Sequence, residues 1–347
     1  MRVNRLTGVR FEAVTHPSKS THLTCEHDKA RWQTPIVIVG PTAVGKTEVA
    51  IELANRIGGE IINADSMQIY SGMNIGTAKP DHCARERTVF HLLDIARPDE
   101  HYTVSDWKQA ASLCIREVTA RGRRAIVCGG AGLYVRALTD NWTMARTCAA
   151  PEIRDALRRD TERLGSPALH KRLSTVDPVT AERLHPNDSV RIVRALEVYE
   201  VTGIPISAHQ SRDRQTRSPM SVHRIGLHLS RPRLYERIDL RVDQMMANGL
   251  ESEVEGLMRK GYSRDLGPMR ALGYKEVVAL LSGEMDRAQA IETIKINTRR
   301  FSKRQQTWFR ADREIQWIDV ASMIPATIAI QVQDLVDSRL ETCPPSV

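Results

Sequence analysis

The sequence predicts an α/β fold, in which a P-loop NTPase-like parallel sheet core carries a helical insertion. The first sign is a β-branched strand pattern that runs into a glycine-rich phosphate-binding motif and then into a helical pattern, over residues 36–57. The second is the return of apolar strand patterns up to residue 319, with helical patterns between them. The third is a stretch at 146–220 that holds helical, Arg-rich patterns and no strand pattern.

The motif after the first strand indicates phosphate binding. Residues 36–39 are all β-branched, which is typical of a buried parallel strand. Backbone amides of the next eight residues, except Pro41, and the N-terminus of the following helix are expected to form a site for phosphate oxygens. Lys46 can neutralise their charge, and the Thr47 hydroxyl can ligate Mg²⁺. As in ATP- and GTP-binding proteins, the motif predicts a bound di- or triphosphate without saying which. It fits G-x-x-x-x-G-K-[ST] at every fixed position and comprises Gly40, Pro41, Thr42, Ala43, Val44, Gly45, Lys46 and Thr47.

Two further strands of the first half end in polar or glycine-rich segments. A strand at 60–65 ends at Asp65, and its carboxyl end is expected beside the phosphate loop. The apolar loop at 67–80 is expected to line a pocket. A buried strand at 124–128 enters a second glycine-rich turn at 129–132, which suits a site built around a polyphosphate. Helical patterns fill the intervals at 48–56, at 104–120 with Thr103 or Ser105 as the cap, and after residue 132.

The composition changes near residue 141, and short helices broken by prolines are predicted from 151 to about 209. The polar residues 210–220 are expected to form the linker that returns to the core. The predicted organisation is a flexible N-terminal extension (1–33), the first part of the core (34–145), the helical insertion (146–220), the second part of the core (221–319) and a tail with one more helix (320–347).

The second part of the core adds two strands and a basic helix. Strands are predicted at 224–229 and 315–319, and a helix from about 232 to 247 places Arg237 and Arg241 on one face. The alternative for these two arginines is surface pairing with the neighbouring Asp239 and Asp243. Further helices are predicted at 251–259, after a turn at 269–274, and at 288–310.

The last of these helices is strongly basic. Phe301 and Trp308 are interleaved with the cations, and such a face favours contact with a nucleic-acid backbone over a solvated charged surface, which is the alternative. Between residues 295 and 313 only Asp312 is acidic. The basic residues are Lys295, Arg299, Arg300, Lys303, Arg304, Arg310 and Arg313.

Composition limits the class of protein. The chain has 347 residues, 41% of them hydrophobic, and a formal net charge of +8, which suggests an anionic partner. No apolar run reaches membrane-spanning length, and the first 33 residues lack the apolar stretch of a secretory signal, so no membrane partner is expected. The six cysteines form no C-x-x-C pair, which favours a reducing cytoplasm without disulfides or a zinc site.

The residues alone leave several enzyme classes open. A kinase that transfers a phosphoryl group fits, and so does an enzyme that uses diphosphate as a leaving group. A switch GTPase fits poorly, because the chain has neither an N-K-x-D motif nor D-x-x-G after a strand. Asp65 is equally open at this point: it could serve as a general base, cap a helix or orient a hydrated Mg²⁺.

Several motifs together resemble those of the bacterial tRNA dimethylallyltransferases. The similarity runs from about residue 34 to 319 in the same order, and kinases share only the first motif. Members of this family attach a dimethylallyl group from dimethylallyl diphosphate to the exocyclic amine of the adenosine 3′ of the anticodon. The motifs are GPTAVGKT (40–47), NADSMQIY (63–70), NIGTAKP (74–80), HLLDI (91–95), HPND (185–188), RALEV (194–198), LGY (272–274) and KRQ-x-TWFR (303–310).

The resemblance implies a role for each matching residue. The phosphate loop would hold the diphosphate, while Lys46, Arg241 and Thr47 with Mg²⁺ neutralise charge as it leaves. Asp65 would be the general base that takes the proton of the amine. The enzyme would act as a monomer in the cytoplasm on the anticodon stem-loop of tRNA. The implied RNA contacts are Asp65, Ser66, Met67, Gln68, Ala131, Arg154, Arg191, Arg194, Arg270, Lys303, Arg304 and Arg310.

One residue departs from the family pattern and keeps an alternative open. The family usually has Thr or Ser where this chain has Ala131, and that hydroxyl helps to position the substrates. A tRNA-binding homologue with impaired catalysis is therefore one alternative, and a small-molecule kinase of the P-loop type is the other.

Overall fold

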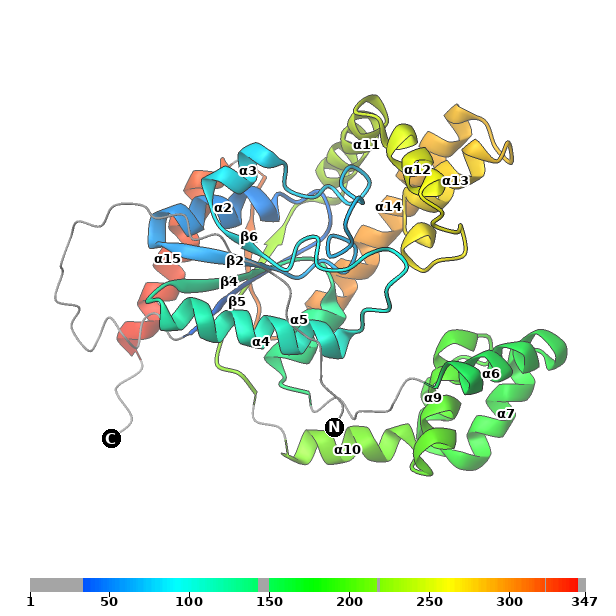
Figure 1. Ribbon diagram of the computed structural model, residues 1–347. Coiled ribbons are helices and arrows are strands. Elements are labelled where there is room, and N and C mark those ends of the chain that lie inside the picture. Colours follow the sequence, from blue (N-terminus) through cyan, green and yellow to red (C-terminus); the bar gives the residue numbers. More distant parts are fainter. Residues whose placement is uncertain (1–33, 143–149, 217–218, 322, 343–347) are drawn as a thin grey trace, which may run out of the picture.

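The computed structural model describes residues 34–142, 150–216, 219–321 and 323–342 (Figure 1). The extension predicted at 1–33 lies outside the described residues. The core is one sheet of parallel strands in the order β3-β2-β4-β1-β5-β6, which confirms the predicted α/β class. The strands are β1 (Ile36–Val39), β2 (Gly59–Asn63), β3 (Phe90–His91), β4 (Arg124–Cys128), β5 (His223–His228) and β6 (Gln316–Asp319).

Side chains of the central strand β1 point alternately to the two faces of the sheet, and each face has its own hydrophobic core. Ile36 and Ile38 join the core under helices α2 (Lys46–Ile57) and α15 (Pro325–Thr342). Val37 and Val39 point the other way, into the larger core under α4 (Val104–Ala120) and α5 (Gly132–Thr139). Figure 1 shows α2 and α4 on opposite sides of the strands. The carboxyl ends of β1, β2 and β4 consequently meet at one edge between the two layers.

Strand β3 and the short helix α3 (His82–Arg87) before it were not predicted from the sequence. Strand β3 has two residues, and Phe90 pairs with Ile61 of β2. A segment this short has no period that a sequence pattern could reveal. The predicted cap of α4 is confirmed, because the side chain of Thr103 accepts a hydrogen bond from the backbone amide of Asp106 within a capping box.

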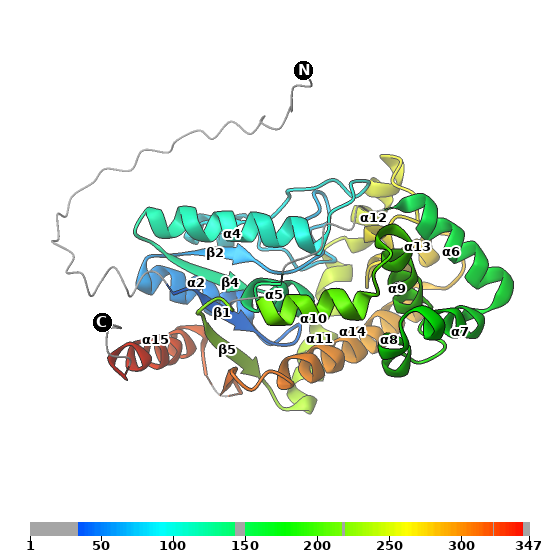
Figure 2. The same ribbon diagram turned by 90° about the horizontal axis from the view of Figure 1, so that it is seen from below.

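The helices between α5 and β5 surround a small core of their own that includes Leu157, Leu173 and Leu196. They lie beside the sheet, away from α15 (Figures 1 and 2). The linker expected at 210–220 is wrong for residues 210–216, which continue α10. The Asp177 carboxylate accepts from the backbone amide of Ser207, and this distant cap supports the first turn of that helix. The helices are α6 (Pro151–Leu164), α7 (Ser166–Val176), α8 (Pro178–Arg183), α9 (Ser189–Thr202) and α10 (Ile206–Thr216).

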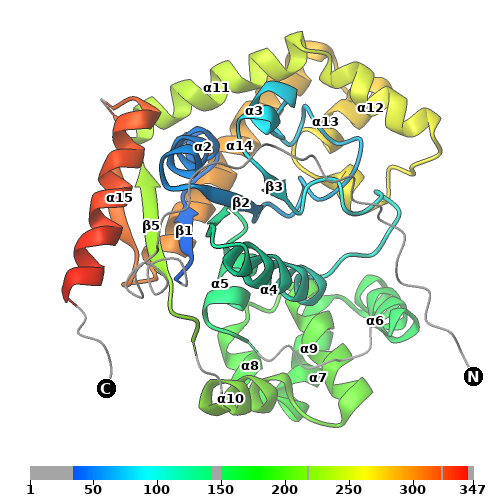
Figure 3. The same ribbon diagram turned by 60° about the vertical axis from the view of Figure 1, so that its left-hand side comes forward.

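Two long helices after β5 pack against each other and extend beyond the strands (Figure 3). Asp243 of the first forms a 2.7 Å ion pair with Lys295 of the second, and Asp239 pairs with Arg299. Lys295 and Arg299 therefore hold the two helices together. Their spacing in the sequence predicted that both lie on a basic face that contacts nucleic acid, and for these two residues that prediction is wrong. The elements of this region are α11 (Arg231–Ala247), α12 (Leu250–Arg259), η1 (Pro268–Arg270), α13 (Tyr274–Leu281) and α14 (Arg287–Arg310), and α3 (His82–Arg87) precedes β3.

Candidate active site

A cavity of about 250 Å³ lies at the carboxyl ends of β1, β2 and β4. The structure brings together here the phosphate loop, Asp65 and Arg241, three features that are far apart in the sequence. A second cavity of about 590 Å³ shares Arg241 and residues 78–81 with the first. The first cavity is lined by Thr42, Ala43, Gly45, Lys46, Thr47, Glu48, Asn63, Asp65, Gln68, residues 77–81, Ala84, Cys128, Gly129, Arg241 and Gln305.

The phosphate loop has the backbone that its glycines predict. Gly45 caps α2 in the left-handed region with φ 101°, where a side chain would be strained. Lys46 folds back over the loop, and its Nζ donates to Pro41 O at 2.8 Å. Burial of the ammonium lowers the pKa of Lys46 to about 8, against the opposing influence of Cys128 and Asp65. The loop is therefore a cationic site, and an anion that enters it would give the Lys46 ammonium an ionic partner.

Helix α11 supplies two cations to this loop. Arg241 donates to Thr42 Oγ1 at 3.3 Å, and Arg237 donates to Val44 O at 3.3 Å. Burial lowers the pKa of Arg241, and Asp65 acts in the opposite direction. The alternative in which these arginines pair with Asp239 and Asp243 is wrong, because both carboxylates face α14 instead.

Asp65 is held in a fixed orientation just beyond β2. Its Oδ1 accepts from the backbone amide of Met67 at 2.9 Å, and its own amide donates to Asn63 Oδ1 at 3.1 Å. The Asn63 amide group also donates to Asp65 O and Leu92 O, while Trp107 Nε1 donates to Asn63 O. Asp65 thus forms a local turn and does not cap a helix. Its second carboxylate oxygen has no protein partner within the part of the chain that the structure describes, so it can accept a proton from a ligand in the cavity.

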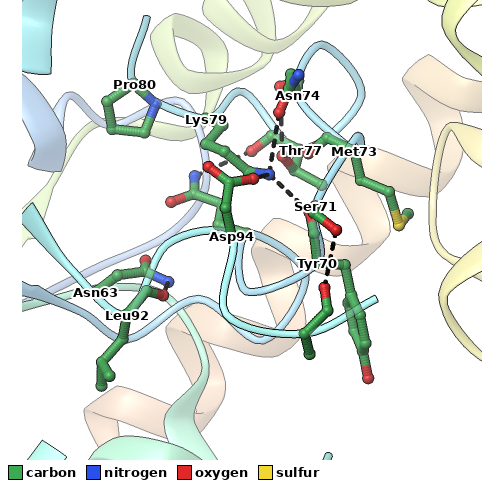
Figure 4. A network of polar contacts seen from close by, with 12 residues as sticks. Asn63, Tyr70, Ser71, Met73, Asn74, Thr77, Lys79, Pro80, Leu92 and Asp94 are labelled. Carbon is green, nitrogen blue, oxygen red and sulfur yellow. Dashed lines mark hydrogen bonds and ion pairs between the residues drawn. The ribbon is translucent and has the colours of Figure 1, made fainter. Parts of the chain in front are cut away.

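The loop from residue 68 to 80 forms one wall of the cavity and is held by buried polar contacts. Gln68 Nε2 donates to Thr77 O and Ala78 O. The ammonium of Lys79 donates to Tyr70 O, Asn74 Oδ1 and Asp94 Oδ1 at 2.7–3.0 Å (Figure 4). Burial lowers the pKa of Lys79, while the Asp94 carboxylate favours its charge. These contacts fix the pocket wall that the sequence predicted for this loop.

Glu253 holds the same loop from the side of α12, and the sequence reasoning missed it. Its carboxylate accepts from the backbone amides of Asn74, Ile75 and Gly76 at 2.8–3.2 Å. It also accepts from the hydroxyl of Tyr274 at 2.6 Å. One carboxylate on α12 therefore satisfies four donors from the loop and from α13.

The second glycine-rich turn lies against α14. A β-carbon on Gly130 would clash with the amide of Gln305, and one on Gly132 would clash with Trp308, so a side chain at either position would displace its neighbour on α14. Ala131 does not line the cavity: it packs against the larger core, and its amide donates to Ala64 O at 3.1 Å. The turn itself is consequently fixed without the hydroxyl that the family usually has there.

The basic residues expected to contact RNA lie outside the cavity, in two groups. Arg154 and Arg194 both pair with the buried Glu197 at 2.9 Å, and Arg191 pairs with Asp188 at 3.0 Å. Glu197, which accepts from two arginines of the insertion, was not predicted from the sequence. Four other cations are exposed on η1 and α14: Arg270, Lys303, Arg304 and Arg310.

Aromatic side chains accompany the exposed cations, as the sequence indicated. The guanidinium of Arg304 lies 5.7 Å from the ring centroid of Phe301, and that of Arg136 lies 5.5 Å and 5.7 Å from the ring centroids of Trp142 and Trp308. Phe301 and Trp308 are each 37% exposed. Flat aromatic and guanidinium groups of this kind can stack on nucleotide bases.

The described residues contain no cluster of three or more His, Cys, Asp or Glu side chains that would hold a metal ion on its own. The cavity nevertheless has oxygen donors at Thr47 and Glu48, beside the phosphate loop. Such a set of oxygen ligands suits Mg²⁺, which binds through one or two protein oxygens together with phosphate oxygens.

In the same described ranges, no helix is long and apolar enough to cross a membrane.

Comparison with known proteins gives a consistent result. Residues 68–312 match the family model described as IPP transferase. A tRNA dimethylallyltransferase of Geobacter metallireducens is 47% identical over 298 residues, 85% of this chain and 94% of that protein. The crystal structure of the full-length tRNA isopentenylpyrophosphate transferase from Bacillus halodurans superposes with a TM-score of 0.67 and 38% identity, covering 89% of this chain and 97% of that one. A eukaryotic dimethylallyltransferase acting on tRNA gives a TM-score of 0.75 at 25% identity, covering 90% and 81%.

Proposed function

This chain belongs to the IPP transferase family, and we propose that it transfers a dimethylallyl group from dimethylallyl diphosphate to the exocyclic amine of the adenosine 3′-adjacent to the anticodon of tRNA. The observation that carries the proposal is the shared cavity. A cationic phosphate loop with Lys46 and Arg241 faces the same space as the carboxylate of Asp65. One side can bind a diphosphate, and the other can accept a proton from a nucleophile.

The phosphate loop binds and activates the leaving group. Its backbone amides and the N-terminus of α2 receive the diphosphate oxygens, and Lys46 and Arg241 neutralise them. Negative charge on these oxygens grows as the bond between carbon and oxygen breaks. The two cations therefore stabilise the transition state more than the ground state, which is the condition for a faster reaction.

Mg²⁺ is the proposed cofactor, and Thr47 is the residue that would hold it, together with diphosphate oxygens. When bound, the ion supplies further neutralisation of the departing diphosphate. Thr47 is the first residue after Lys46 in the opening turn of α2, so its hydroxyl lies at the same end of that helix as the phosphate site.

Asp65 is the proposed general base. An aromatic amine is a weak nucleophile, because its lone pair is delocalised into the ring. As the nitrogen forms its bond to the allylic carbon, the carbon–oxygen bond breaks, the electron pair leaves with diphosphate, and a proton of the amine moves to Asp65. The turn through Asn63 and Met67 keeps one carboxylate oxygen available for this proton.

RNA binding is proposed for the exposed cations and aromatics around the cavity. The target adenosine must leave the stack of the anticodon loop before its amine can reach Asp65. Lys303, Arg304 and Arg310 on α14 and Arg270 on η1 are exposed and suited to phosphates, with Trp308 available for stacking. We further propose that the protein acts as a monomer, and in the cytoplasm, where its tRNA substrate would be met.

The test supplies the protein with either ATP or dimethylallyl diphosphate, each with and without an anticodon stem-loop. We expect consumption of dimethylallyl diphosphate only when RNA is present, with release of one diphosphate for each modified RNA. Consumption of ATP without RNA would instead support a small-molecule kinase. Binding of RNA without transfer would support an impaired homologue, the alternative raised by Ala131.

A further inference from the structure

Gln305 connects the two glycine-rich turns of the cavity. It projects from α14, is buried, and lines the cavity directly. Its Oε1 accepts from the backbone amide of Thr42 at 2.8 Å, and its Nε2 donates to Gly130 O at 3.0 Å. The first contact lies in the phosphate loop after β1, and the second lies in the turn after β4. A single side-chain amide therefore links the two backbone segments that follow the neighbouring strands β1 and β4.

The contacts around this amide fix its orientation. Its nitrogen faces a carbonyl oxygen and its oxygen faces an amide, so a flipped side chain would oppose like groups at both ends. There is also no spare room, because a β-carbon on Gly130 would clash with Nε2. Thr42 is held from its other side as well, where Arg241 donates to its hydroxyl. The position of Thr42 is thus set jointly by α11 and α14.

We propose that Gln305 is a positioning residue for the diphosphate substrate: its amide sets the separation of the phosphate loop from the second glycine turn. Because Gln305 occupies the amide of Thr42, the remaining amides of the loop, from Ala43 to Thr47, are the ones left to receive phosphate oxygens. The same helix exposes Lys303 and Arg304, so the diphosphate site is anchored to the helix that carries RNA-facing cations. The proposal rests on the proposed function for the identity of its diphosphate substrate.

The test compares Gln305→Met with Gln306→Met, which makes the same change one residue along and has a partly exposed side chain. Methionine keeps most of the volume of Gln305 but makes neither hydrogen bond, leaving two backbone groups unpaired. We expect Gln305→Met to raise the KM for dimethylallyl diphosphate and the Kd for inorganic diphosphate, measured without RNA, by about tenfold. We expect Gln306→Met to change neither value by more than about twofold.

A second pair of variants tests the route of the effect. Gly130→Ala pushes against the Gln305 amide, so it should weaken inorganic diphosphate binding strongly in the native background. In a Gln305→Ala background the obstacle is gone, and the same substitution should cost much less. This non-additivity is the signature of two residues acting through one contact. Equal costs in the two backgrounds would overturn the proposal.

Failure of the inference and failure of the function are separable. A Gln305→Met protein with native KM and native Kd for inorganic diphosphate, but a lower melting temperature, would show a purely structural residue and overturn the inference. A native protein that transfers no prenyl group would contradict the proposed function. If Gln305→Met still weakens inorganic diphosphate binding, the positioning role of Gln305 would be supported even so.

Discussion

Binding of dimethylallyl diphosphate should weaken as the pH rises above 8, because Lys46 loses its proton. Burial lowers the pKa of Lys46 to about 8 in the free enzyme, so the ammonium is charged below that pH and neutral above it. A bound diphosphate favours the charged form, so it raises the pKa of Lys46 back toward the ordinary value of 10.5. Binding above pH 8 therefore requires uptake of a proton.

The size of the effect follows from the two pKa values. Affinity should fall about tenfold for each pH unit above 8, which gives a loss of about 30-fold at pH 9.5. The substrate does not compensate, because its terminal phosphate loses the last proton near pH 6, at about the value for phosphate esters. Arg241 keeps its charge throughout this range, since guanidinium groups remain protonated.

Isothermal calorimetry of dimethylallyl diphosphate binding without RNA, between pH 7 and 9.5, would measure this dependence, with buffers of different ionisation enthalpy to count the protons taken up. Lys46→Met is the matched control: its affinity should be low at pH 7 and nearly flat with pH. A native protein whose affinity is constant from pH 7 to 9.5 would refute the assignment of Lys46 as the titrating cation of the loop.

Three further predictions concern the other site residues. Asp65→Asn should lower single-turnover transfer by about 10²–10⁴-fold, with RNA affinity in a filter-binding assay unchanged, because only proton acceptance is lost; equal loss of RNA affinity would contradict this role. Arg241→Ala should lower kcat by about 10²–10³-fold in steady-state assays, because charge on the leaving diphosphate loses a buried partner; a change in KM alone would show ground-state binding instead. Glu253→Gln should lower stability by about 1–3 kcal/mol in urea unfolding, because an amide cannot accept from all four donors. The exposed Glu255→Gln is its control and should be nearly neutral.

The sequence predicted the sheet and its phosphate loop because both depend on local patterns. Of the six strands in the described residues, five follow apolar runs, and the loop motif fixes its own backbone through Gly45. The position of Asp65 followed from the rule that the strands of a parallel sheet carry ligands at their carboxyl ends. The exception, β3, has two residues and depends on pairing with β2.

The contacts that hold the cavity together could not be predicted, because they join residues distant in the sequence. Gln305 is 263 residues from Thr42, and Glu253 is 177–179 residues from the loop amides that it binds. The basic face of α14 was predicted from spacing, but spacing could not show that Asp239 and Asp243 on another helix neutralise Lys295 and Arg299. Such partners depend on how helices pack, which a single sequence does not reveal.

In the proposed function, one cavity holds both the phosphate loop that binds the diphosphate and the base, Asp65, that acts on an adenosine amine. The most direct measurement is a single-turnover reaction of the protein with dimethylallyl diphosphate and an anticodon stem-loop, followed by mass spectrometry of the nuclease-digested RNA. We expect one dimethylallyl group on the adenosine 3′-adjacent to the anticodon, and none when that adenosine is replaced by guanosine. Prenylation that persists after this replacement, or no transfer by the native protein, would contradict the proposed function.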